Sequence, residues 1–327
     1  MSTITILVPC YNEEAVLHIF YKTVKDVIAG IPKYKFEFLF INDGSTDGTL
    51  ELLRQMAGEA ENIQYISLSR NFGKESAMLA GFDHADGDAV IVIDADLQDP
   101  PSLIPAMLAE WEKGWQDVYA QRKSRDGETW LKKITSRLYY RILGRLSDVP
   151  VLKDVGDFRL LDRQCIEELR RLREHQRYTK GLFCWIGFRK KAILYDRDPR
   201  AAGETHWNYW KLTKLAINGI TSFSNIPLQM SSWLGAIVSI GAFVYMLEVV
   251  IKTLIFGGDV PGYPSLIAVV LFVSGVQLIV LGVIGEYLGK VFTESKRRPV
   301  YVISEMSQQE QVSNALYMKG ENSYFPG

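Results

Sequence analysis

The sequence predicts an α/β domain followed by a C-terminal hairpin of two membrane-spanning helices. Over the first 120 residues, short apolar runs alternate with stretches of helical periodicity, which is the pattern of βαβ units around a parallel sheet. Residues 231–290 are nearly free of charge, whereas residues 1–230 are mixed and charge-rich. These two observations together predict a globular domain joined to a membrane anchor.

The expected strands and helices alternate along the first part of the chain. Strands are expected at Ile4–Pro9, Glu37–Ile41, Ile63–Ser67, Ala89–Ile93 and Val118–Gln121. Helices are expected at Glu13–Ala29, Asp47–Ala60, Lys74–His84 and Ser102–Lys113. The near-continuous apolar strands fit a sheet that is covered on both faces. Because ligands of such sheets bind at the carboxyl ends of the strands, the residues just after each strand are the first candidates for function.

Two long apolar segments, about residues 231–256 and 265–288, follow the domain. Each exceeds the roughly 20 residues that a helix needs to cross a bilayer. The linker between them carries no Lys or Arg, whereas basic residues lie before the first segment and after the second. The positive-inside rule therefore predicts an external linker, with both termini and the α/β domain in the cytoplasm. Within the first span, Glu248 and Lys252 can pair at i, i+4, and both a functional and an anchoring role stay open.

Two amphipathic segments before the spans are expected to lie on the membrane surface. Residues 129–147 combine apolar residues at helical spacing with a basic row formed by Lys133, Arg137, Arg141 and Arg145. The alternative is the solvated face of an ordinary packed helix. His206–Phe223 mixes aromatic and basic residues, as membrane interfaces favour.

Composition and charge narrow the class of protein further. With a net charge of −1, the chain has no overall field that points to nucleic acid. The three cysteines are widely spaced and form no CxxC pair, so neither a disulfide framework nor a zinc site is expected. The N-terminus lacks a basic region and reaches Glu13 too early for a signal peptide. The polar tail after Glu305 is expected to be mobile.

The segment Asp94-Ala95-Asp96-Leu97-Gln98 directly follows an apolar run that ends at Ile93. In an extended chain alternate residues share a side, so Asp94, Asp96 and Gln98 are expected to converge. Three hard oxygen ligands suit Mg²⁺ or Mn²⁺ rather than zinc. The alternative is that the acidic residues only begin the helix expected at Ser102.

Two further motifs join a strand to a helix. Pro9-Cys10-Tyr11-Asn12-Glu13-Glu14 follows the first strand, and Asn42-Asp43-Gly44-Ser45-Thr46-Asp47 follows the second. Their side chains and amides can bind a base, ribose or phosphate, or they can serve turns and helix caps. Ser45, Thr46 and Asp47 are expected to be structural, whereas Asp43 is expected to be free to reach a ligand.

In their order and spacing, these three motifs resemble those of family 2 glycosyltransferases, which have the Rossmann-like GT-A fold. The nearest branch uses polyprenyl phosphate and includes dolichyl-phosphate mannose synthase and, more nearly, the bactoprenol glucosyltransferases. Residues 70–75, 155–160 and 285–289 match the same branch, so the resemblance covers about residues 3–303. Asn42 departs from the pattern, because many members of the family carry Asp there.

The resemblance implies a role for each matching position. The expected nucleotide-sugar-binding residues are Pro9, Tyr11, Glu13, Asp43, Arg70, Lys74 and Asp94. The expected ligands of Mg²⁺ or Mn²⁺ are Asp94, Asp96 and Gln98. The expected catalytic residues are Asp157, Asp96 and Arg159. The cations expected to bind donor or lipid phosphates are Arg122, Arg200 and, more weakly, Lys211.

The reaction that the resemblance implies is the inverting transfer of a hexose from a nucleotide sugar to undecaprenyl or another polyprenyl phosphate. UDP-glucose is the favoured donor, and the product would supply lipid-linked sugar for surface polysaccharide at the cytoplasmic face of the inner (plasma) membrane. A phosphate acceptor has a second pKa of about 6 and needs no strong base. Asp157 therefore either removes a proton or orients the acceptor through Arg159, unless the two merely form a structural pair.

Two alternatives to this function stay open. The donor could be GDP-mannose or a UDP-aminosugar, or the chain could be a non-catalytic membrane partner with a decayed transferase domain. The expected organisation is an α/β domain at 1–128, an acceptor region with amphipathic helices at 129–230, the hairpin at 231–290 and a cytoplasmic tail at 291–327. Association of hairpins predicts a homo-oligomer.

Overall fold

The computed structural model describes residues 1–123, 155–175, 177–195, 226–256 and 262–307, and these form two compact units. The described residues up to 195 and from 299 onward form an α/β unit. The described residues between 226 and 298 form a helical unit. Both amphipathic segments predicted before the spans, at 129–147 and 206–223, lie outside the described residues.

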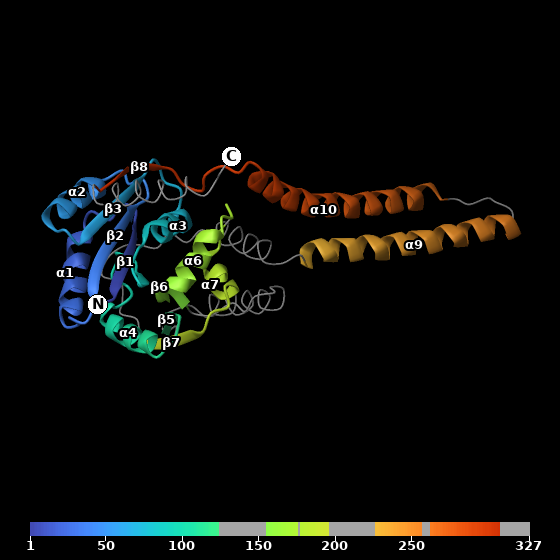
Figure 1. The fold of residues 1–327 in the computed structure, drawn as a ribbon. Coiled ribbons are helices and arrows are strands. Elements are labelled where there is room, and N and C mark those ends of the chain that lie inside the picture. Colours follow the sequence, from blue (N-terminus) through green and yellow to red (C-terminus); the bar gives the residue numbers. More distant parts are fainter. Residues whose placement is uncertain (124–154, 176, 196–225, 257–261, 308–327) are drawn as a thin grey trace, which may run out of the picture. The chain divides into compact units, whose positions relative to one another are not determined.

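An eight-stranded sheet with the order β7-β5-β6-β4-β1-β2-β3-β8 forms the centre of the α/β unit (Figure 1). Four adjacent strands of this sheet are mutually parallel, and all four were predicted. They are β1 (Thr3–Cys10), β2 (Lys35–Asn42), β3 (Ile63–Leu68) and β4 (Ala89–Val92). Their carboxyl ends therefore meet at one edge of the sheet, where the predicted motifs lie.

The outer strands correct the prediction of a purely parallel sheet. They are β5 (Asp117–Arg122), β6 (Val155–Asp162), β7 (Lys190–Tyr195) and β8 (Ile303–Met306). Strand β6 lies between β4 and β5 and is antiparallel to both, and β8 is antiparallel to β3. A strand buried on both faces has the same apolar pattern in either direction, so periodicity could not reveal this. Three of these strands come from residues beyond 128.

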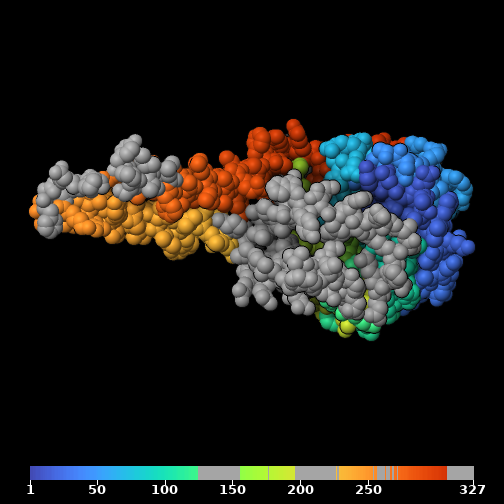
Figure 2. Space-filling view, turned by 180° about the vertical axis from the view of Figure 1, so that it is seen from behind, coloured from blue at the N-terminus to red at the C-terminus, as the bar shows by residue number. Residues whose placement is uncertain are grey.

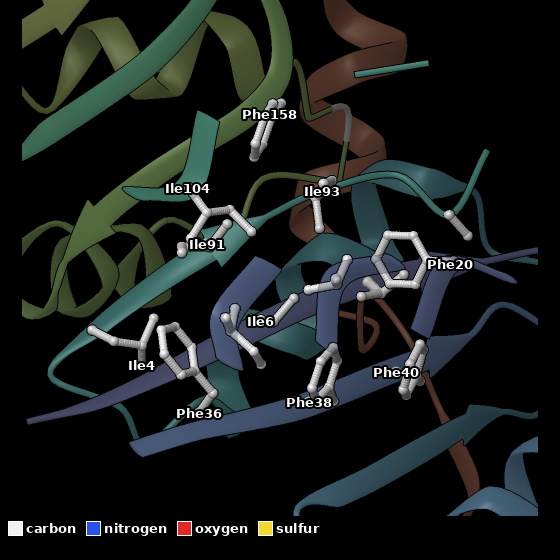
Figure 3. Packing of buried hydrophobic residues seen from close by; sticks show 14 of the residues in the cluster. Ile4, Ile6, Phe20, Phe36, Phe38, Phe40, Ile91, Ile93, Ile104 and Phe158 are labelled. Atoms are coloured by element: carbon white, nitrogen blue, oxygen red, sulfur yellow. The ribbon is translucent and has the colours of Figure 1, made fainter. Parts of the chain in front are cut away.

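Helices cover both faces of the sheet (Figure 1). On one face lie α1 (Leu17–Ala29), α2 (Thr49–Glu59), and α4 (Ile104–Glu112) with the 3₁₀ turn η1 (Pro101–Leu103) before it. On the other face lie α3 (Lys74–His84) and α6 (Arg163–Arg171). Alternate residues of β1 and β2 enter the core under α1, as Figure 3 shows for Ile4, Ile6, Phe36, Phe38 and Phe40. Each fully buried aromatic or aliphatic side chain there stabilises the fold by roughly 1.5–3 kcal/mol.

Helix α3 is buried on almost every side and fixes the start of the site. All residues from Ser76 to Phe82 are buried, because the sheet covers one side of the helix and α6 another. A side chain at Gly81 would place its Cβ 2.1 Å from Leu7 Cδ1, so glycine permits the close contact with β1. This packing sets Lys74, the first residue of α3, beside the carboxyl ends of the parallel strands.

The chain after the hairpin returns to the sheet, which corrects the prediction of a separate tail from residue 291. Strand β8 pairs with β3, and Ser307 still donates its backbone N–H to Tyr65. Glu305 accepts two hydrogen bonds from Arg54, at 2.9 and 2.6 Å, and one from the Tyr65 hydroxyl at 3.0 Å. The strand ends at Met306, so the polar residues up to Ser307 belong to the α/β unit.

The helical unit consists of α9 (Ile226–Phe256) and α10 (Tyr263–Ser295), which lie side by side (Figures 1 and 2). Both are long and apolar enough to cross a membrane, over Leu228–Lys252 and Phe272–Ser295, with mean hydropathies of 2.2 and 1.6. Almost none of these residues is buried by protein, so their apolar side chains are exposed. The predicted pair inside the first span is present, with Lys252 Nζ 2.6 Å from Glu248.

Candidate active site

A cleft of about 350 Å³ lies at the carboxyl ends of β1, β2 and β4. Seven residues that the sequence singled out line it together: Pro9, Tyr11, Glu13, Asp43, Lys74, Asp94 and Asp96. The remaining lining residues are Cys10, Asn71, Gly73, Ala77 and Ala95. Carboxylates and one ammonium group therefore share a concave site of the size that small-molecule ligands occupy.

The loop after β2 is fixed by contacts with the loop after β1. Asn12 donates its backbone N–H to the Ser45 hydroxyl at 3.0 Å and accepts from the Thr46 N–H at 2.8 Å. Asp47 accepts from the backbone N–H of Thr49 at 3.1 Å and from its hydroxyl, and so stabilises the turn that leads into α2. These contacts agree with the structural role predicted for Ser45, Thr46 and Asp47.

Asp43 lines the cleft, but both of its carboxylate oxygens also bind backbone amides. Its two oxygens accept the backbone N–H groups of Phe72 at 2.7 Å and Gly73 at 2.9 Å, and the residue is only 3% exposed. Burial raises the pKa of its carboxyl above the usual value, although the two amides and Arg70 act against this. Asp43 therefore fixes the loop before α3 at the wall of the cleft.

Asn42, which departs from the family pattern, has a structural role beside it. Its amide donates to the Ser67 hydroxyl at 2.9 Å and accepts the Ser45 N–H at 3.2 Å, and it is 1% exposed. A neutral amide can both donate and accept, whereas a carboxylate at this buried position could only accept. The carboxylate charge that Asp would bring to position 42 would therefore lie beneath the cleft and not in it.

Lys74 links two carboxylates from different strands. Its Nζ lies 2.7 Å from Asp94, after β4, and 2.6 Å from Asp157, on β6. Burial alone would lower the pKa of Lys74, but the charges of Asp94 and Asp157 outweigh it and raise that pKa. Burial likewise favours a raised pKa for Asp157, yet the charges of Lys74 and Lys180 bring it below the usual value. Asp157 is therefore ionised at neutral pH.

The segment after β4 forms a turn, which corrects the expectation of an extended chain. Strand β4 ends at Val92, and Leu97 adopts a left-handed conformation with φ of 54°. Asp96 is exposed, lines the cleft and accepts the backbone N–H of Gln98 at 3.1 Å. The Gln98 side chain does not line the cleft, so the side chains of this motif do not all converge.

The acidic edge of the cleft suits a hard divalent cation in part. The described residues contain no group of three or more His, Cys, Asp or Glu side chains placed to bind a metal ion. Mg²⁺, however, commonly binds through only one or two carboxylates plus substrate phosphates. Burial and the charges of Asp96, Asp94 and Asp47 raise the pKa of Glu13 from 4.5 to about 7, which shows the concentration of negative charge. Asp94 and Asp96 are two carboxylates that line this edge of the cleft.

Arg159 does not reach Asp157, contrary to the predicted orienting role. It is 1% exposed and pairs with Asp117 at 3.2 Å. Its guanidinium also lies over the Phe183 ring, 3.7 Å from the centroid. A buried arginine with its own carboxylate and an aromatic partner is a structural residue of the sheet.

The other predicted cations lie outside the cleft or outside the described residues. Arg70 is exposed beside the cleft, with its guanidinium 4.1 Å from the centre of the Phe72 ring. Arg122, at the end of β5, donates from Nε to the Tyr195 hydroxyl at 3.3 Å. Arg200 and Lys211 fall on residues that the structure does not describe.

No role was predicted from the sequence for Lys180, Glu75 or Thr179, which the structure places near Asp157 or its neighbours. Lys180 lies 4.0 Å from Asp157, and the backbone N–H of Thr179 donates to Glu75 at 2.9 Å. Glu75 and Thr179 are 104 positions apart. Lys180 belongs to the short helix α7 (Thr179–Trp185), which follows no strand, so no local pattern pointed to it.

The raised pKa of Glu13 predicts a pH-dependent stability. Between its ordinary value of 4.5 and its folded value of about 7, the folded state binds more protons than the unfolded state. The free energy of unfolding therefore falls as the pH rises through this window. In Glu13→Gln this fall should be absent, so thermal unfolding from about pH 5 to 8 should show a flatter profile than wild type. Parallel profiles would contradict the assignment, and exposed Glu61→Gln is the control.

Comparison with known proteins finds relatives that match this chain over nearly its whole length. Residues 5–170 match the model of the family described as Glycosyl transferase family 2. An uncharacterized glycosyltransferase of Synechocystis is 46% identical over 93% of this chain and 95% of its own. The bactoprenol glucosyl transferase of Shigella phage SfV is 42% identical, and a prophage homologue from Escherichia coli is 41% identical, each over 93% of this chain and 99% of its own. The chain belongs to glycosyltransferase family 2.

Proposed function

We propose that this protein transfers glucose from UDP-glucose to polyprenyl phosphate at the cytoplasmic face of the membrane. One observation carries the proposal: Asp157, bound to Lys74 at 2.6 Å, stands beside a cleft of about 350 Å³ in a chain that continues into two candidate spans. Support comes from relatives named bactoprenol glucosyl transferase, which are 41–42% identical over nearly their full length. The lipid nature of that acceptor fits the exposed apolar helices.

The donor is proposed to occupy the cleft. Pro9, Tyr11, Glu13 and the loop that Asp43 fixes would contact the nucleoside, and Arg70 would lie near it. A divalent cation, Mg²⁺ or Mn²⁺, is proposed to bind Asp96 and Asp94, which both line the cleft. When bound, such an ion neutralises charge on the diphosphate leaving group.

The protein's own residues account for the rest of the proposed mechanism. As the glycosidic bond breaks, positive charge develops on the sugar, and the in-line attack of the acceptor inverts the anomeric configuration. A phosphate monoester has a second pKa of about 6, so at neutral pH it supplies its own nucleophile. Asp157, ionised and bound to Lys74, would orient this nucleophile and stabilise the developing positive charge. Lys74 would connect the donor side, at Asp94, with the acceptor side, at Asp157.

The proposed topology places the α/β unit in the cytoplasm. Lys290, Lys296, Arg297 and Arg298 lie at the end of α10 and directly after it, whereas the 257–264 linker carries no basic residue. Basic residues are enriched on the cytoplasmic side of membrane proteins. The active site would then face the cytoplasmic pool of nucleotide sugars.

Cysteine labelling in intact cells tests this topology. A cysteine introduced at Gly258 should react with an impermeant thiol reagent added outside, and one introduced at the exposed Glu61 should not. The background should be low, because Cys10, Cys165 and Cys184 are all buried. Labelling at position 61 without labelling at position 258 would show that the orientation is the reverse of the one proposed.

A donor comparison tests the proposed reaction. Purified protein in detergent would be given polyprenyl phosphate, Mg²⁺ and either UDP-glucose, GDP-mannose or a UDP-aminosugar. The expected result is a lipid whose mass increases by one hexose with UDP-glucose alone. A lipid product from another donor would change the proposed donor sugar but would leave the proposed reaction class unchanged. No lipid product from any donor would contradict the proposal.

A further inference from the structure

Two lysines flank the same carboxylate in the α/β unit. Lys74 Nζ, on α3, lies 2.6 Å from Asp157 Oδ2, and Lys180 Nζ, on α7, lies 4.0 Å from Asp157 Oδ1. The side chain of Asp157 is 14% exposed, whereas that of Lys180 is 40% exposed. Lys74 already contacts two carboxylates, but at 4.0 Å Lys180 makes only a loose pair with one. Its ammonium group therefore keeps donors for an additional anion.

A buried hydrogen-bonded pair fixes the position of Lys180. Glu75 accepts the backbone N–H of Thr179 at 2.9 Å and also the Thr179 hydroxyl. Thr179 is fully buried, so loss of either bond would leave a buried polar atom without a hydrogen-bond partner. Glu75 directly follows Lys74, and Thr179 directly precedes Lys180. The pair thus joins α3 to α7 and sets the two ammonium groups on either side of Asp157.

We propose that Lys180 binds the phosphate of the acceptor lipid beside Asp157, and that Glu75 and Thr179 are its positioning residues. The inference rests on the proposed function, because it assigns a phosphate-monoester acceptor. Lys74 lines the donor cleft, but Lys180 does not, so Lys180 belongs to the other side of Asp157. An ammonium group there offsets the charge of a phosphate dianion brought close to a carboxylate. Without it, Asp157 would repel the acceptor.

Kinetics with each substrate varied in turn test the role of Lys180. Lys180→Ala should raise the KM for a short-chain polyprenyl phosphate by roughly 10- to 100-fold, the loss expected for a hydrogen bond to a charged group. The Kd of UDP-glucose should stay at the wild-type value. Lys180→Arg should restore most of the acceptor affinity, because it keeps the charge. Lys113→Ala, which removes an exposed lysine directly after α4, should behave as wild type.

Conservative variants of Thr179 test the positioning pair. Thr179→Val removes the hydroxyl donor with little change of volume and should raise the KM for the acceptor, whereas Thr179→Ser should not. A merely structural role would instead lower the unfolding temperature and the amount of active protein, with an unchanged KM. Measuring the unfolding temperature of each variant separates the two outcomes.

Three results would overturn the inference. An unchanged acceptor KM in Lys180→Ala would exclude contact with the acceptor phosphate. A raised Kd for UDP-glucose would assign Lys180 to the donor phosphates. If wild type binds UDP-glucose but never modifies polyprenyl phosphate, the proposed function fails and the inference fails with it. If wild type forms the lipid product and Lys180→Ala is fully active, the inference about Lys180 is rejected but the proposed function stands.

Discussion

Asp157→Asn is expected to reduce glycosyl transfer by roughly 10²–10⁴-fold near pH 6, the range that a positioned acid or base contributes, and to recover activity as the pH rises. The substitution keeps the size of the side chain but removes its charge. Among the residues that the structure describes, Lys74 then keeps Asp94 as its one ionic partner at contact distance, and Lys180 loses the carboxylate at 4.0 Å. The remaining activity then depends on the charge of the acceptor phosphate itself.

The recovery distinguishes orientation from proton removal. Above a second pKa of about 6, the acceptor is a dianion and needs no base. If Asp157 mainly orients the acceptor, the rate of the variant should rise between about pH 6 and 9, a range that brackets that pKa. A flat, near-zero profile would make Asp157 an obligate base. Binding of UDP-glucose must be measured in the same preparation, because a misfolded variant would also give a flat profile.

Asp96→Ala is expected to abolish transfer, with a loss of roughly 10³-fold or more. Metal ions contribute several kcal/mol of charge stabilisation in such reactions, and each 1.36 kcal/mol corresponds to about a tenfold change in rate. Asp96 is exposed in the cleft, and its charge helps to raise the pKa of Glu13, so it is a well-placed ligand for a cation. Removing divalent metal from wild type with EDTA should have the same effect.

Two measurements accompany this substitution. Transfer is followed with increasing Mg²⁺ or Mn²⁺, and binding of Mn²⁺ is followed by electron paramagnetic resonance with UDP present. Asp96→Ala should lose the bound Mn²⁺ signal, and Asp26→Ala, which removes an exposed carboxylate on α1, should keep it. Full wild-type activity after complete removal of divalent metal would contradict the metal assignment.

The donor side of the site could be predicted from the sequence because of a property of parallel sheets. Residues that follow parallel strands meet at one edge, so Pro9, Tyr11, Asp94 and Asp96 come together whatever the details of the loops. The spans could be predicted because composition alone determines whether a helix can enter a bilayer. Neither prediction required knowledge of a contact between distant residues.

The acceptor side could not be predicted, because it depends on such contacts. Arg159 is two residues from Asp157, yet it pairs with Asp117 on the neighbouring strand. The partner of Asp157 is instead Lys74, which is 83 positions away. Both facts follow from the insertion of β6 between β4 and β5, and the apolar pattern of β6 gives no sign of its direction. The amide partners of Asp43 also lie in another loop, so no local pattern pointed to them.

Transfer of label into lipid in oriented membrane vesicles tests the central claim most directly. Vesicles from cells that produce the protein would be prepared with either the cytoplasmic or the external face outward and given radiolabelled UDP-glucose without detergent. Label should enter the organic-extractable lipid only when the cytoplasmic face is outward, and Asp157→Asn should greatly reduce it near pH 6. Lipid labelling restricted to the external face, or donor binding with no labelled lipid in either preparation, would contradict a cytoplasmic transferase that acts on polyprenyl phosphate.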